Sequence, residues 1–190
     1  MADDGDGEST GTGGKKSGLS CLLIGAGLAV GGVCIIGILA AIAIPAFINY
    51  VKRSKTTETG SNLHVLAAGA AVYYAEEHVS VDGTILAHCS VDPAITPDTP
   101  GPAKRSLSGR WPESFVALSL TPPDPLYYRY EIVAGPSRCG IGPDQPIYTF
   151  RAHGDLDGDG VLSTFEISVG SDATNEIYSA PGIYVEQELE

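Results

Sequence analysis

The feature that most constrains this chain is a long stretch without charge near its N-terminus. No Asp, Glu, Lys or Arg occurs between Lys16 and Lys52, and nearly all of residues 19–48 are apolar or small. About 20 apolar residues suffice to cross the hydrocarbon core of a bilayer as an α-helix. The run is also longer than the apolar core of a secretory signal peptide. We therefore expect a transmembrane helix over residues 19–48.

The segments on either side of this run differ from each other. Residues 1–18 are rich in Gly, Asp, Ser and Thr and offer little to bury, which predicts a disordered tail. Residues 49–78 keep a helical pattern, because apolar side chains recur there at steps of three and four. These side chains are Leu63, Leu66, Ala67, Ala70, Tyr73 and Tyr74. We expect an amphipathic continuation of the same helix, with its apolar face against a folded head.

Beyond residue 78 the composition shifts to Pro, Gly and strand-forming residues. Tyr128, Tyr130 and Ile132 alternate with charged residues, which is the period of a half-buried strand. Further strands are expected over 147–152 and 163–170, with a short one near 182–187. Several short strands after one long helix are typical of the α+β class. Residues 79–190 are therefore predicted to form a β-rich head with an antiparallel sheet.

The order of residues inside the apolar run says more about the class of protein than its hydropathy does. The stretch "IIGILAAIAIPAF", Ile35 to Phe47, is followed by a basic cluster and then by "NLHVLAAGAAVYYAEE". This pattern resembles the N-terminal helix of type IV pilins and of type II secretion pseudopilins. The resemblance implies a pilin-like α+β fold, in which one long N-terminal helix, membrane-spanning in its first half, packs on a small antiparallel sheet.

The resemblance also implies a function and a location. Its members are non-enzymatic structural subunits that assemble through their helices into homo- or hetero-oligomeric filaments. It implies a single-pass protein of the inner membrane, with a cytoplasmic N-terminus and a head in the periplasm or in an extracellular filament. The charges flanking the run do not orient the helix by themselves, because lysines lie on both sides.

Two signature positions depart from the family. The family has a glycine at the peptidase cut and a glutamate a little further on, and this chain has Leu23 and Leu28 there. Gly18 is the nearest upstream glycine that follows lysines, so cleavage is expected at Gly18 or not at all. One alternative is a membrane anchor that never polymerises and carries a calcium-binding or adhesion module. In that case the small residues of the run would serve only helix packing in lipid.

The sharpest chemical motif is "DLDGDGVLSTFE", residues 155–166, which fits the spacing of a twelve-residue calcium loop. The candidate ligands are Asp155, Asp157, Asp159, the carbonyl of Val161, Ser163 and Glu166. A hard cation binds six to eight oxygens, and alternate residues of a tight loop converge on it. The flanking segments alternate with a period of two, so we expect the loop in a β-hairpin and not between two helices. The alternative is a solvated turn, in which Asp and Gly are also common.

The four cysteines fall in two environments. Cys21 and Cys34 lie in the apolar run, where cysteine is a small packing residue, and Cys89 and Cys139 lie in the head. In the oxidising periplasm that the resemblance implies, a Cys89–Cys139 disulfide is expected, the alternative being two free thiols.

Charge and motif content narrow the remaining function classes. The net charge of −12 argues against binding nucleic acid phosphates. His64, His78, His88 and His153 have no metal-ligand spacing, and no nucleophile or phosphate-binding motif is present. We therefore expect no enzymatic activity and no small-molecule substrate. The expected partners are the membrane and other filament subunits, with calcium as the cofactor.

Overall fold

The computed structural model describes residues 16–190 except 97, 108 and 137, and side chains from residue 31 onward. The chain divides into two compact units, Met1–Ile48 and Asn49–Glu190. The predicted tail over residues 1–18 lies mostly outside the described residues, and its last residues belong to the first helix.

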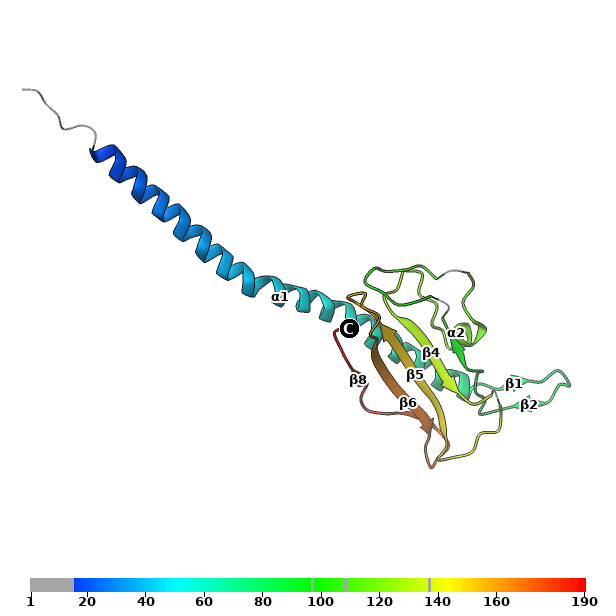
Figure 1. Cartoon of the computed structure of the whole chain (residues 1–190). Helices are drawn as coiled ribbons and strands as arrows, with labels where there is room; N and C mark the ends of the chain where they lie inside the picture. The colour runs from blue at the N-terminus through cyan, green and yellow to red at the C-terminus, as the bar shows by residue number, and fades with distance from the viewer. Residues whose placement is uncertain (1–15, 97, 108, 137) are drawn as a thin grey trace, which may run out of the picture. The chain divides into compact units, whose positions relative to one another are not determined.

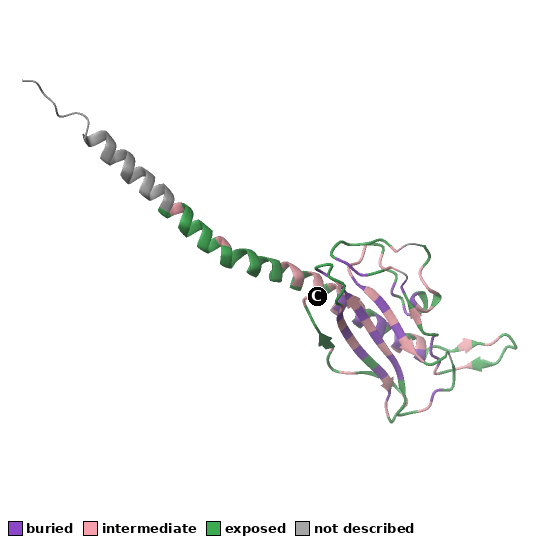
Figure 2. Cartoon of the chain, in the orientation of Figure 1, coloured by how far each residue is buried: buried purple, intermediate pink, exposed green. Residues whose placement is uncertain are grey.

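Helix α1 (Lys16–Ala75) runs without a break through Pro45, which confirms the prediction of one long N-terminal helix. Its large apolar side chains from Val33 to Tyr50 are 50–71% exposed, and Figure 2 shows this part of the helix exposed along its length. By length and composition the helix can cross a membrane. The described part of the chain does not bury these side chains.

The second unit is built on an antiparallel sheet of six strands, which confirms the predicted α+β layout. Its strands are β3 (Ala94–Ile95), β4 (Arg129–Ala134), β5 (Pro146–Gly154), β6 (Ser163–Ser171), β7 (Ile177–Ser179) and β8 (Tyr184–Glu186). The order is β3-β4-β5-β6-β7, and β8 pairs with β6 beside β7. Figure 1 shows β4, β5 and β6 side by side as the long central strands.

The core lies between the sheet and the second half of α1. Leu63, Leu66 and Ala70 are fully buried on the helix, as the three- and four-residue spacing predicts. They belong to one apolar cluster with alternate residues of the sheet. The sheet residues include Tyr130, Ile132, Tyr148, Phe150, Ala152, Phe165, Ile167 and Val169. The strand residues between them therefore line the opposite, outer face of the sheet.

Three small elements complete the second unit. Strands β1 (His78–Val79) and β2 (Ile85–Leu86) form a separate two-stranded hairpin. The short helix α2 (Glu113–Ala117) adds the fully buried Phe115 to the core. The sequence pattern does not predict α2, although Glu113 in its first turn is the kind of residue that favours a helix start. The pattern does not predict β1, β2, β3 and β7 either, none of which exceeds three residues.

Candidate functional site

The predicted calcium loop closes the hairpin between the two longest strands. Gly154 at the end of β5 pairs with Ser163 at the start of β6, so residues 155–162 form the connection. Both flanking elements are strands, as the period of two predicts. Gly158 and Gly160 have φ of 82° and 90°, a region that glycine occupies without strain. These glycines therefore let the loop backbone adopt a positive φ at two positions.

The loop brings its three aspartates together. One ligand oxygen from each of Asp155, Asp157 and Asp159 lies within 4.8 Å of the other two. The loop backbone donates a hydrogen bond to each of them. Gly158 N donates to Asp155 Oδ1 and Val161 N to Asp159 Oδ1, both at 2.7 Å, and Asp159 N donates to Asp157 Oδ1 at 3.3 Å. Three carboxylates this close repel one another unless a cation lies among them.

The other predicted ligands have different surroundings. Glu166 lies on the outer face of β6 and pairs with Arg151, with 2.6 Å between Arg151 Nε and Glu166 Oε1. The Ser163 hydroxyl is buried and donates to the carbonyl of Glu190 at 3.0 Å. Val161 lies in the loop itself, next to Gly160. The structure thus gathers the aspartates and holds Glu166 in a cross-strand ion pair.

Two charged residues that the sequence analysis did not include lie beside the loop. Lys52 on α1 donates to Asp157, with 2.9 Å between Nζ and Oδ2, and this hydrogen bond lowers the pKa of Asp157. The negative charge of Asp157 in turn raises the pKa of the Glu190 side chain. A fourth carboxylate therefore lies near the aspartates, and one ammonium already offsets part of their charge.

The base of the loop is tightly packed. The ring of Tyr128 lies against Gly154 so closely that a Cβ on Gly154 would overlap the ring. Burial raises the pKa of the Tyr128 hydroxyl strongly. Tyr128 also meets Phe165 edge to face, with ring centroids 5.8 Å apart. The aromatic side chains under the hairpin therefore fix the position from which the loop extends.

A second polar cluster connects α1 to the start of β4. The carboxylate of Glu58 accepts hydrogen bonds from the backbone N–H groups of Tyr127 at 3.1 Å and Tyr128 at 3.4 Å. It also accepts from the Tyr130 hydroxyl at 3.3 Å and lies 3.8 Å from Lys104 Nζ. Burial raises the pKa of Glu58 despite these contacts. The arrangement is a structural contact between helix and sheet.

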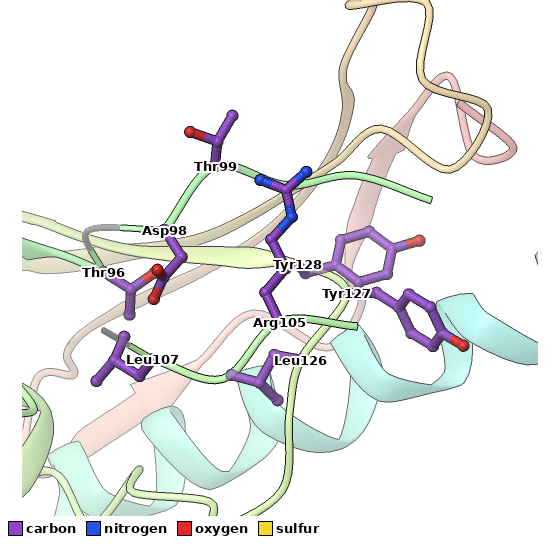
Figure 3. A pocket seen from close by; sticks show the side chains of 8 residues that line it. All are labelled: Thr96, Asp98, Thr99, Arg105, Leu107, Leu126, Tyr127 and Tyr128. Atoms are coloured by element: carbon purple, nitrogen blue, oxygen red, sulfur yellow. The ribbon is translucent and has the colours of Figure 1, made fainter. Parts of the chain in front are cut away.

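A small cavity lies next to this cluster, and Figure 3 shows the side chains that line it, with Arg105 extending toward Thr99 beside the Tyr127 and Tyr128 rings. Its volume is about 10 Å³. That is room for a single water molecule, so the cavity is too small for an organic ligand.

The expected disulfide is present between Cys89 and Cys139. The histidines lie apart, each in local contacts: His78 with the carbonyl of Tyr73, His88 with Asn175, and His153 with Thr164 and Glu131. The side chain of His64 is exposed on α1.

Comparison with known proteins finds no matching family model, no similar curated protein and no similar solved structure.

Proposed function

We propose that this protein is a membrane-anchored structural subunit of a pilin-like or pseudopilin-like filament. The observation that carries the proposal is the division of α1 into two kinds of surface. Residues 33–50 expose large apolar side chains, whereas the later part of the helix buries one apolar face, with Leu63, Leu66 and Tyr74, in the core that it shares with the antiparallel sheet. A helix that is apolar all round is stable in lipid or among other apolar helices. A helix that serves in turn as a membrane anchor and as the core of a filament needs such a surface.

The disulfide supports the proposed location. Disulfides persist in oxidising compartments and are rare in the cytosol. The Cys89–Cys139 bond therefore favours a head in the periplasm or outside the cell, with the N-terminus of α1 in the cytoplasm. The protein would then be a single-pass protein of the inner membrane.

The experiment that tests the filament proposal is mechanical shearing of cells that produce the protein. We expect the sheared fraction to contain high-molecular-weight assemblies of this chain, with residues 33–48 still present by intact-mass spectrometry. The Ile42→Asp variant is the control, because a carboxylate at the centre of a membrane helix costs about 2.5–3.5 kcal/mol of insertion free energy. This variant should lose the sheared fraction.

The opposite result favours the alternative, a membrane-anchored module that does not polymerise. In that case the intact chain stays in the membrane as a monomer, and shearing releases only head fragments that lack residues 33–48. The replacement of the family's signature residues by Leu23 and Leu28 is the observation that favours this alternative.

We also propose that loop 155–162 binds calcium and stabilises the head. The support is the convergence of three aspartate oxygens in a loop with the spacing of a calcium site. Carboxylate and carbonyl oxygens suit a hard cation, and the cluster contains no thiol or imidazole of the kind that zinc prefers. Glu190 is a nearer candidate for a fourth carboxylate than Glu166, which is paired with Arg151.

A further inference from the structure

The outer face of the sheet, opposite α1, carries a groove with a volume of about 370 Å³. It lies where β5, β6 and β7 meet. Gly170 contributes no side chain to this face, and its direct partner on β7 is Tyr178. The segment before β5 crosses beside it, because a Cβ on Gly170 would lie 2.7 Å from the carbonyl oxygen of Gln145. Because Gly170 has no side chain, this segment can approach β6 closely, and it lines the groove together with Tyr178.

The lining of the groove combines one aromatic ring with polar groups. Tyr178 is 55% exposed, so its ring is available for contact with a ligand. Thr149 and Ser168 are direct partners in the β5–β6 register and point to the outer face. Among the described residues, their hydroxyls and the carboxylate of Asp144 form no hydrogen bond with the protein. The groove therefore offers donors and acceptors that are free to bind a ligand.

The wall opposite Tyr178 is held in place by hydrogen bonds to β6 and the turn after it. Gln145 N donates to Ser171 Oγ, and Ser171 N donates to the Gln145 carbonyl, both at 2.9 Å. Asp144 N donates to the carbonyl of Asp172 at 3.2 Å, and Asp144 has φ of 53°, which is uncommon for a residue with a side chain. A wall fixed in this way loses little conformational entropy when a ligand binds.

The chemistry of the lining selects one class of ligand. None of the lining residues is Lys, Arg or His, so the groove offers no positive charge to bind a phosphate, sulfate or carboxylate. The free hydroxyls and the carboxylate make it a poor site for an acyl chain, because their hydrogen bonds with water would be lost. A sugar ring has an apolar face of C–H groups that stacks on an aromatic ring, and hydroxyls at its edge that bond to such polar groups. The volume lies in the lower part of the range for small-ligand sites.

We propose that this groove binds a neutral saccharide of one or two rings. The ring of Tyr178 stacks on the apolar face of the sugar. Thr149, Ser168 and Asp144 exchange hydrogen bonds with its hydroxyls. This inference is independent of the filament proposal, because it concerns the outer face of the head alone, and a monomeric anchored protein would bind the sugar equally well.

Saturation-transfer NMR on the full chain tests the inference. The protein is held in amine oxide micelles, since detergents with sugar headgroups would compete, and it is titrated with maltose, lactose and N,N′-diacetylchitobiose. We expect at least one of them to bind with a dissociation constant in the millimolar range or tighter. Tyr178→Ala should weaken that binding by about 10-fold or more, because the stacked ring is lost. Ser168→Val should also weaken it, and this second variant serves if truncating Tyr178 disturbs the fold.

The matched control is Tyr184→Ala, which removes another exposed tyrosine from the neighbouring edge strand β8, outside the groove. This variant should bind as the unmodified protein does. The inference is overturned if none of the three saccharides shows saturation transfer to the unmodified protein. It is equally overturned if the bound saccharide tolerates both Tyr178→Ala and Ser168→Val without loss of affinity.

Discussion

Glu58 is the residue whose replacement best measures how α1 is held to the sheet. Its side chain is 14% exposed and accepts hydrogen bonds from two backbone N–H groups and one hydroxyl. Glu58→Ala would leave these donors without an acceptor, and we expect it to lower the free energy of unfolding by about 2–4 kcal/mol. Glu58→Gln keeps one acceptor oxygen and should cost less. Denaturant unfolding of the full chain in detergent measures both.

The control for this prediction is Glu77→Ala, which removes an exposed carboxylate just beyond the end of α1. It should change the free energy of unfolding by no more than about 0.5 kcal/mol. Equal stability of all three variants would show that the Glu58 contacts do not hold the helix to the sheet.

The pH dependence of Glu58 has a defined sign. Because its pKa in the folded protein is raised above 4.5, folding favours the protonated carboxyl. Its contribution to stability is therefore greatest below pH 4.5 and decreases as the pH rises through the raised pKa. The advantage of the unmodified protein over Glu58→Gln should shrink over the same pH range.

At the scale of single residues, the sequence predicts contacts that are local in the chain. Asp155, Asp157 and Asp159 are brought together by a tight loop, so their spacing alone is informative. Lys52 lies 105 residues before its partner Asp157, and no local pattern connects them. Glu166 has the spacing of a ligand, but its place in a strand puts it opposite Arg151. The strand pairing therefore decides its partner.

Two glycines of α1 form a matched pair for testing how the helix packs. A Cβ on Gly69 would overlap the carbonyl oxygen of Leu118, the residue after α2, whereas a Cβ on Gly60 would have nothing within 4 Å. Alanine is about 1 kcal/mol more favourable than glycine in a helix interior. Gly60→Ala should therefore raise the free energy of unfolding by about 0.5–1 kcal/mol.

Gly69→Ala should have the opposite effect. The added methyl group would meet backbone atoms of Leu118, which cannot move aside as the end of a flexible side chain can. We expect a loss of about 1–3 kcal/mol, the usual cost of overpacking. Thermal unfolding of the two variants side by side is the measurement. A stabilising Gly69→Ala would mean that α1 and the segment after α2 lie farther apart than the structure shows.

At the scale of elements, length and periodicity decide what the sequence predicts. The pattern indicates α1 and the long strands β4, β5 and β6, because each repeats its period several times. Strands β1, β2 and β3 have two residues each, and α2 has five, so no period is expressed within them. Their place depends on contacts with the rest of the head. Phe115 on α2, for example, is buried by the core that it joins.

At the scale of the whole molecule, the sequence predicts the α+β class, because the apolar run and the later strands are distinct in composition. The order of the sheet depends on pairings that composition does not encode, such as β8 lying beside β7 on the same edge of β6. The Cys89–Cys139 disulfide is expected because the resemblance implies an oxidising periplasm, since the sequence does not show that the two cysteines lie close together. It connects segments 50 residues apart and so restrains the unfolded head over that length.

The calcium proposal leads to a prediction for the stability of the whole head. A ligand that binds only the folded state stabilises it by about 2.7 kcal/mol when its concentration is 100 times the dissociation constant. For a head of this size we expect the melting temperature to rise by about 5–10 °C between excess chelator and saturating calcium. Magnesium should give a smaller rise, because it requires a nearly ideal octahedral site.

The variants assign this effect to the loop. Asp157→Asn combined with Asp159→Asn removes two of the three converging carboxylates. The melting temperature of this double variant should therefore no longer depend on calcium, whatever its stability without the ion. Asp82→Asn, in the turn of the β1–β2 hairpin, removes one exposed carboxylate elsewhere and should leave the dependence intact. A melting temperature that is the same in chelator and in calcium would identify residues 155–162 as a solvated turn. In that case the Lys52–Asp157 ion pair would be the interaction that offsets the repulsion between the aspartates.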